Sequence, residues 1–264
     1  MYDFQYQRPT TIPDVQKALA SSPEAMLLAG GQTLIPTLKM RLRKPSLLVD
    51  LSGLRAFNEI QTIGEKIAIG AMATHASVAA NAVLKKRLPA LAALAGGIGD
   101  AQVRHRGTIG GSIANADPAA DYPAAVVALN ADIVTDKRTI AADAFFKGLF
   151  ETALEPSEII TNVHFKKPEV AAYIKFPNPA SRFALVGVFV AKFKDGVRVA
   201  VTGAAPSVFR VPSWEEALSA SFEPDVIDVD AVPAEGLNSD IHASSDYRAH
   251  LLGVLARRAV TACG

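Results

Sequence analysis

The 264-residue sequence contains a single cysteine, Cys263, which lies one residue from the C-terminus. One cysteine can form no internal disulfide, no cysteine-rich zinc site and no iron–sulfur cluster, because each of these needs two or more thiols. The sequence therefore predicts a cytoplasmic protein in which any metal-centred redox chemistry belongs to another chain.

The sequence also lacks an excess of either charge and a long apolar run. Lys plus Arg number 27 and Asp plus Glu number 26, whereas nucleic-acid and membrane-surface binders usually show a basic excess. Gly, Pro or charged residues interrupt every apolar run before the roughly 20 residues that span a bilayer. The start, MYDFQYQRPT, has an acid where a signal peptide needs basic residues. We expect no nucleic-acid partner and no membrane span.

Several catalytic motifs are missing as well. The chain has no G-x-x-x-x-G-K-[ST] phosphate loop, no H-E-x-x-H zinc motif and no G-x-S-x-G nucleophile elbow. The segment GGIGDAQ at 96–102 begins like a Rossmann fingerprint, but the third small residue is out of place and no strand precedes it. The five histidines show no metal-ligand spacing. We therefore predict no catalytic side chain and no metal ligand in this chain.

The patterns that are present predict an α+β fold in three parts, 1–57, 58–170 and 171–264. The first part has a helix capped by Thr10 or Thr11, followed by two short strands, 25–30 and 46–51. The second has one or two helices within 76–99 and a helix opened by Asp117-Pro118. The third has a hairpin turning at Asp195-Gly196, followed by two helices, 213–220 and 246–260.

Two glycine-rich segments carry the chemistry: AGGQT at 29–33 and GTIGGSIANADPAAD at 107–121. Each offers consecutive backbone N–H groups together with small polar side chains. Consecutive N–H groups in turn conformations form concave sites for phosphate oxygens. Two such loops from different lobes can close on a diphosphate; the alternative is that both are tight turns needed for packing.

Three further features have open readings. Asp121 lies four residues after Asp117, the expected helix cap, and either binds a polar group of a ribose or flavin or is a solvated acid. Lys175 either places a positive charge beside an electron-rich ring or is an exposed lysine. The basic stretch 103–106, VRHR, either faces a phosphate or a partner subunit or is a solvated loop.

The segments AGGQTLIPTLKMRLRKPSLLVDLSGL, RHRGTIGGSIANADPAADYPAA and YRAHLLGVLARRAV resemble the FAD-binding (medium) subunit of molybdenum hydroxylases of the carbon monoxide dehydrogenase and xanthine dehydrogenase type. The resemblance covers nearly the whole chain, in the order of the family. It implies a two-lobed p-cresol methylhydroxylase-type FAD domain, followed by a C-terminal domain with a three-stranded antiparallel sheet and helices.

The resemblance also implies which residues bind FAD. The two glycine-rich segments would hold its diphosphate and neighbouring groups, Ile98 would contact the cofactor with an apolar side chain, and Ile160 and Lys175 match positions near it. No histidine follows the glycine pair, so nothing there would attach flavin covalently. The implied cofactor-binding residues are Ala29, Gly30, Gly31, Gln32, Thr33, Leu34, Ile98, Thr108, Gly110, Gly111, Ser112, Asn115, Asp121, Ile160 and Lys175.

The implied function is electron transfer. A large molybdenum–pterin subunit would hydroxylate the substrate, and a small subunit with two [2Fe–2S] clusters would pass electrons to FAD in this chain. The electrons would leave to NAD⁺, a quinone or oxygen. Three alternatives remain open: a stand-alone FAD oxidase of the same fold, a FAD-dependent reductase of the murein-precursor type, and a non-redox nucleotide-binding interaction module.

Overall fold

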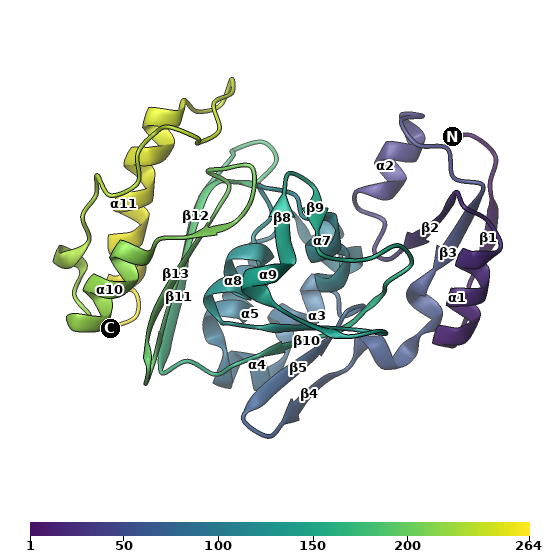
Figure 1. Cartoon of the computed structure of the whole chain (residues 1–264), viewed down its shortest axis with the longest axis horizontal. Coiled ribbons are helices and arrows are strands. Elements are labelled where there is room, and N and C mark those ends of the chain that lie inside the picture. The colour runs from purple at the N-terminus through teal and green to yellow at the C-terminus, as the bar shows by residue number, and fades with distance from the viewer.

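The computed structural model describes residues 1–264 and places the strands in three sheets that share no strand, with a separate two-stranded ribbon. The three sheets are drawn from successive parts of the chain, 5–50, 60–165 and 170–210. The first sheet lies at the N-terminal end of the molecule, and the third lies toward the opposite end beside α10 and α11 (Figure 1). The α+β class is confirmed; the part boundaries at 57/58 and 170/171 stay predictions.

The first sheet is parallel, in the order β1-β3-β2, and is packed against helix α1. The Thr11 hydroxyl accepts the Asp14 N–H at 3.3 Å, so Thr11 is the cap of α1, and Pro13 lies in its first turn. The expected helix and strands are confirmed, while β1 was not predicted. The elements are β1 (Gln5–Gln7), α1 (Ile12–Ala20), β2 (Ala25–Leu28), α2 (Leu34–Lys39) and β3 (Leu47–Asp50).

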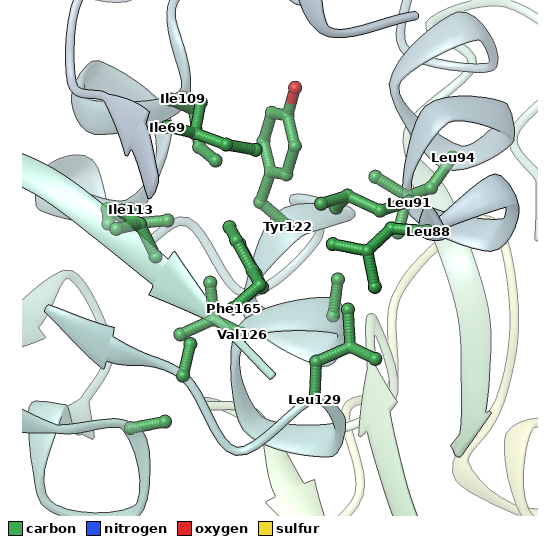
Figure 2. Close-up of a cluster of buried hydrophobic side chains, with 14 of the residues drawn as sticks. Ile69, Leu88, Leu91, Leu94, Ile109, Ile113, Tyr122, Val126, Leu129 and Phe165 are labelled. Atoms are coloured by element: carbon green, nitrogen blue, oxygen red, sulfur yellow. The ribbon is translucent and has the colours of Figure 1, made fainter. Parts of the chain in front are cut away.

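The second sheet is antiparallel, in the order β4-β5-β10-β6-β7, and covers the largest core of the molecule. Figure 2 shows Tyr122 in this core among Ile69, Ile109 and Leu91. The strands are β4 (Ile60–Ile63), β5 (Lys66–Gly70), β6 (Asp132–Thr135), β7 (Thr139–Ala141) and β10 (Ile160–Phe165), and β8 (Phe146–Gly148) and β9 (Glu151–Thr152) form the separate ribbon.

Helices fill the long connection between β5 and β6, and there are more of them than predicted. Residues 75–96 form three helices where one or two were expected. The Asn81 side chain accepts the Leu84 N–H at 3.0 Å and so starts a new helix, and Pro89 cannot continue the previous one. The helices are α3 (His75–Ala80), α4 (Ala82–Arg87), α5 (Pro89–Gly96), α6 (Ala101–Arg106), α7 (Ile109–Asn115), α8 (Tyr122–Ala128) and, after β7, α9 (Ala142–Phe145).

The prediction that Asp117-Pro118 opens a helix is wrong. Asp117 Oδ1 accepts the Ala119 N–H at 2.9 Å and closes a turn, and α8 begins at Tyr122. The Thr202 hydroxyl lies 3.0 Å from the Pro118 carbonyl and 2.7 Å from that of Ala120, which ties the turn to the third sheet. Because these carbonyls bond elsewhere, the turn does not continue as helix. The basic stretch 103–106 is also not a loop, since it lies in α6.

The third sheet is antiparallel, in the order β11-β12-β13-β14. Three long strands agree with the expected sheet, and a two-residue strand at the edge adds a fourth. The hairpin turns at Asp195-Gly196 as predicted, and both predicted helices are present. The elements are β11 (Val170–Pro177), β12 (Ala184–Phe193), β13 (Gly196–Thr202), β14 (Phe209–Arg210), α10 (Pro212–Ala220) and α11 (Ser245–Thr261).

The third sheet is buried on both faces, which places β11 beside the second part of the chain. One face packs on α10 and α11 through residues such as Val188 and Val199, and the other contributes Phe189 and Ala200 to the core of the second part. Arg198 Nε also donates to the Val127 carbonyl of α8 at 3.0 Å. None of the helices combines the length and apolar composition needed to cross a bilayer.

Tyr122, which is buried, and Tyr173, which is half-buried, should respond oppositely to loss of the hydroxyl. Tyr122 is buried and its hydroxyl has no partner, whereas the Tyr173 hydroxyl donates to Asp121 Oδ1 at 2.6 Å. We expect Tyr122→Phe to raise the free energy of unfolding by about 1–3 kcal/mol and Tyr173→Phe to lower it by a similar amount. Urea unfolding followed by circular dichroism measures both; a destabilised Tyr122→Phe chain would contradict the assignment of an unpartnered hydroxyl.

Candidate functional site

The first glycine-rich segment connects β2 to α2 and presents a run of unused donors. None of the backbone N–H groups of residues 29–33 donates to an acceptor within the protein. Gly31 has φ +74°, a left-handed conformation that glycine adopts without strain. The expected series of free N–H groups is therefore present here. Donors of this kind need an acceptor from solvent or from a ligand.

Gly30 has a different role, because it faces protein rather than open space. A Cβ on Gly30 would overlap the Arg106 carbonyl oxygen and lie 2.8 Å from Gly107 Cα. Similarly, a Cβ on Gly111 would lie 3.3 Å from Ala29 Cβ. The two glycine-rich segments therefore lie against each other, as predicted for two loops that close on one ligand.

The second segment differs from the first in its donors. Thr108 caps α7 by accepting the Gly111 N–H at 3.1 Å, and the Gly110 N–H donates to the Ala71 carbonyl at 2.8 Å. The N–H groups of Ile109 and Ser112 also bond within the protein, to Ala73 and Thr108. The expectation of consecutive free N–H groups is wrong for this segment, because a helix begins there and uses them.

Four polar side chains near the two segments make no hydrogen bond within the protein. They are those of Gln32, Thr33, Ser112 and Asn115, and all four are exposed or half-buried. Thr33 precedes α2 but does not cap it through its side chain. The donors and acceptors on these side chains are free to bind a polar ligand.

Ile98 lies in the turn between α5 and α6, and two cationic side chains donate hydrogen bonds to the carbonyl groups of this turn. Arg104 Nη1 donates to the Ile98 carbonyl at 3.0 Å and to that of Gly99 at 2.9 Å. Lys175 Nζ donates to the neighbouring Gly97 carbonyl at 2.9 Å. Sequence reasoning included Ile98 and Lys175, and it singled out the basic stretch 103–106 that contains Arg104, but it did not predict that Arg104 binds the carbonyl groups of this turn.

Asp121 and Lys175 form a buried ion pair between α8 and β11. Their atoms Oδ1 and Nζ are 3.0 Å apart, and their side chains are 4% and 12% exposed. Burial raises the pKa of Asp121, while Lys175 and the Tyr173 hydroxyl oppose the shift. Lys175 is therefore not an exposed lysine, and Asp121 is not a solvated acid. Asp121 precedes α8 without capping it through its side chain.

Ile160 lies in strand β10. Its side chain is 5% exposed and belongs to the same core as Ile109 and Ile113. Its expected contact with a cofactor stays a prediction. No group of three or more His, Cys, Asp or Glu side chains is placed to hold a metal ion.

A buried histidine behind the second segment was missed by sequence reasoning. The His75 backbone N–H donates to the Gly107 carbonyl at 2.9 Å, and its ring centroid lies 5.3 Å from that of Tyr122. A Cβ on Gly107 would lie 2.5 Å from His75 Nε2. Burial, with a smaller contribution from the charge of Arg104, lowers the pKa of His75 to about 4.

Comparison with known proteins identifies the family. Residues 2–168 match the family model described as the FAD binding domain in molybdopterin dehydrogenase. The chain belongs to this family. The nicotine 6-hydroxylase medium subunit of Paenarthrobacter nicotinovorans is 34% identical, over 98% of this chain and 97% of its own. The carbon monoxide dehydrogenase medium chain of Hydrogenophaga pseudoflava is 31% identical, over 98% and 96%.

Solved structures of the family share the whole fold. Carbon monoxide dehydrogenase from Hydrogenophaga pseudoflava aligns with a TM-score of 0.93 at 32% identity, covering 99% of this chain and 97% of that one. Quinoline 2-oxidoreductase from Pseudomonas putida 86 aligns with a TM-score of 0.90 at 28% identity, with 99% and 97% covered. The family resemblance and the fold expected from it are confirmed: the chain is an oxidoreductase subunit with an FAD-binding domain.

Gly30 and Gly96 form a matched pair for testing the contact between the segments. We expect Gly30→Ala to lower the free energy of unfolding by about 1–3 kcal/mol, because its Cβ meets rigid backbone. A Cβ on Gly96 would lie 3.8 Å from Ala79 Cβ, and Gly96 is the last residue of α5. We therefore expect Gly96→Ala to raise the free energy of unfolding by about 0.5–1 kcal/mol. Urea unfolding measures both, and equal effects would refute the close approach at Gly30.

Acid should destabilise the fold through His75. Its pKa is about 4 in the folded chain against 6.5 unfolded, so the unfolded state binds the proton first as pH falls. The loss in free energy of unfolding should reach about 3 kcal/mol between pH 6.5 and 4. We expect His75→Leu to flatten the pH dependence of the urea midpoint in this window. His164→Gln is the control; burial lowers its pKa too, but it is half-exposed. An unchanged slope in His75→Leu would disprove the assignment.

Proposed function

We propose that this chain is the FAD-binding electron-transfer subunit of a molybdenum hydroxylase complex. In this proposal electrons pass from [2Fe–2S] clusters of a small subunit to FAD and then to NAD⁺, a quinone or oxygen. The observation that carries the proposal is the run of unused N–H groups at 29–33, which faces a second glycine-rich segment in a chain of the FAD-binding family.

The residues present fit the diphosphate of FAD. A diphosphate needs several donors at close range, and the segment 29–33 offers five backbone N–H groups without side chains on Gly30 and Gly31. The side chains of Gln32, Thr33, Ser112 and Asn115 add polar groups that no protein atom uses. Thr108 and the two glycines of α7 bring the second segment close enough to complete the site. Gln32 follows the glycine pair, so binding would be non-covalent.

The flavin ring would lie near Ile98 and Lys175. FAD supplies the redox chemistry, and the protein binds it, orients it and adjusts its electrostatic surroundings. The Ile98 turn is held by Arg104, and Lys175 Nζ is fixed by Asp121 and by the carbonyls of Gly97 and Arg182, at 2.9 and 3.0 Å. These contacts give an apolar surface and a positive charge a defined position. No side chain of this chain is needed as an acid or base in substrate hydroxylation.

The other redox centres would be in partner subunits. The relatives are named medium subunits and medium chains, and this chain covers 97% and 96% of their length. Its one thiol, Cys263, has a pKa raised by burial to about 11 and no other cysteine beside it. We therefore assign the molybdenum–pterin and [2Fe–2S] centres to a large and a small partner subunit and, because the chain uses so few cysteines, place the complex in the cytoplasm.

Gln32→Glu tests the proposed diphosphate site without straining the backbone. Gln32 is exposed, so a carboxylate there preserves the fold but repels an anionic diphosphate. We expect the affinity for FAD to fall about tenfold to a hundredfold, which is about 1.4–2.8 kcal/mol. Titration of the apoprotein with FAD, followed by flavin fluorescence, measures it.

Gln5→Glu is the matched control, because Gln5 is an exposed glutamine on β1 away from the glycine segments. It should leave the affinity unchanged. Gly31→Asp is a poorer test, because φ +74° would strain any other residue at that position. Equal FAD affinity in Gln32→Glu and wild type would refute the assignment of this segment, and a purified complex without flavin would refute the proposed function.

A further inference from the structure

The segment that begins at the last residue of α2, residues 39–44, has six consecutive exposed side chains with the sequence KMRLRK. We call it the basic–apolar segment. Met40 and Leu42 are 70% and 69% exposed, among the most exposed large apolar side chains of the molecule. Large apolar side chains held in water usually mark a surface that another molecule covers. The segment therefore needs an explanation beyond the fold.

The charge of the basic–apolar segment is unpaired. Lys39, Arg41, Arg43 and Lys44 supply four positive charges within six residues, and no carboxylate forms an ion pair with any of them. The chain as a whole carries a net charge of only +1. The excess is thus local, and a matching partner surface must be acidic.

The backbone conformation of the segment is also unfavourable for the residue types that occupy it. The Leu42 N–H donates to the Thr37 carbonyl and the Arg41 N–H to that of Leu38, both at 3.0 Å, which is the Schellman end of a helix. The residue at the left-handed position is usually glycine, but here it is Arg41, with φ +59°. The following apolar residue usually packs on the helix, yet Leu42 is exposed. Helix termination alone explains neither residue.

Tyr2 extends the surface. Its ring is 42% exposed and lies 5.6 Å from the Arg41 guanidinium carbon and 5.5 Å from Lys44 Nζ. Such cation–π contacts hold the cations near the ring. Tyr, Met and Arg are enriched where proteins bind one another, especially at residues that contribute most to affinity. In Figure 1, α2 and the N-terminus lie together at the end of the molecule opposite α11.

We propose that Tyr2 and the basic–apolar segment form a docking surface for another chain of the same complex, through an acidic surface with an apolar hollow for Met40 and Leu42. The proposal rests on the proposed function, because it requires a multi-subunit complex. A phosphate polymer or an anionic membrane fits less well, because the chain carries a net charge of only +1 and the segment is too short for an amphipathic helix. The docked chain would lie one short helix, α2, from the glycine pair.

Cross-linking of the purified complex tests the contact directly. A zero-length carbodiimide joins a lysine to a carboxylate that touches it, and mass spectrometry locates the link. We expect Lys39 and Lys44 to link to Asp or Glu of another chain. Lys85 and Lys86 on α4 are exposed and without ion pairs, and they should not. Links from Lys39 and Lys44 only within this chain, or to a second copy of it, would overturn the proposal.

Arg41→Gly separates docking from folding. Glycine relieves the left-handed strain, so the variant should unfold at an equal or higher urea concentration than wild type. Co-expressed with its partner chains, it should nevertheless be retained in the complex at least tenfold less well in 0.3 M salt, with the FAD content of the isolated chain unchanged. The double variant Arg41→Glu/Arg43→Glu should lose more, and Lys85→Glu/Lys86→Glu should lose nothing.

The outcomes distinguish this proposal from the function on which it rests. Full retention of Arg41→Gly and of Arg41→Glu/Arg43→Glu in an FAD-containing complex would overturn the docking surface alone. Wild-type binding to vesicles of anionic lipid or to RNA that the double variant loses, without any change in subunit retention, would also overturn it. A wild-type preparation with neither flavin nor partner chains would contradict the proposed function instead.

Discussion

The close approach of Gly30 to the backbone of Arg106 and Gly107 is the contact on which the rest of the site depends. It brings the turn after a parallel strand of the first sheet against the end of α6, just before α7, in the second part of the chain. Only a residue without a Cβ permits this distance. Every polar group assigned to FAD lies on one side or the other of this contact, so its geometry sets the spacing of the donors.

The two glycine-rich segments have different roles in the site. The first leaves its N–H groups unused, while the second uses its own to begin α7 and to bond the carbonyl groups of Ala71 and Ala73, which follow β5. Gly110 is then required because a Cβ would lie 2.5 Å from Ala71 Cβ. The first segment is thus suited to binding anions, and the second to holding the first in place. The two segments have a similar glycine content, but glycine is required in each for a different physical reason.

This difference also marks the limit of sequence reasoning here. Periodicity and capping residues predicted α1, α10, α11 and the hairpin, because local preference and tertiary packing agree there. They did not predict that residues 109–115 are helical or that α8 starts at Tyr122, because contacts with Ala71, Ala73 and Thr202 decide both. The role of Arg104 and the burial of His75 were not predicted for the same reason: they depend on carbonyl groups and packing that only the folded chain defines.

The buried pair of Asp121 and Lys175 is best understood through its cost. Removing two charges from water costs several kcal/mol each, and replacing such a pair by apolar residues is often neutral or stabilising. Stability alone therefore does not explain a pair whose side chains are 4% and 12% exposed. The pair does fix Nζ of Lys175 between the Gly97 and Arg182 carbonyls, next to the Ile98 turn. In the proposed site, a positive charge held there by a buried carboxylate would keep one position whether or not the flavin ring proposed beside it carries electrons, as a site that only binds and orients its cofactor requires.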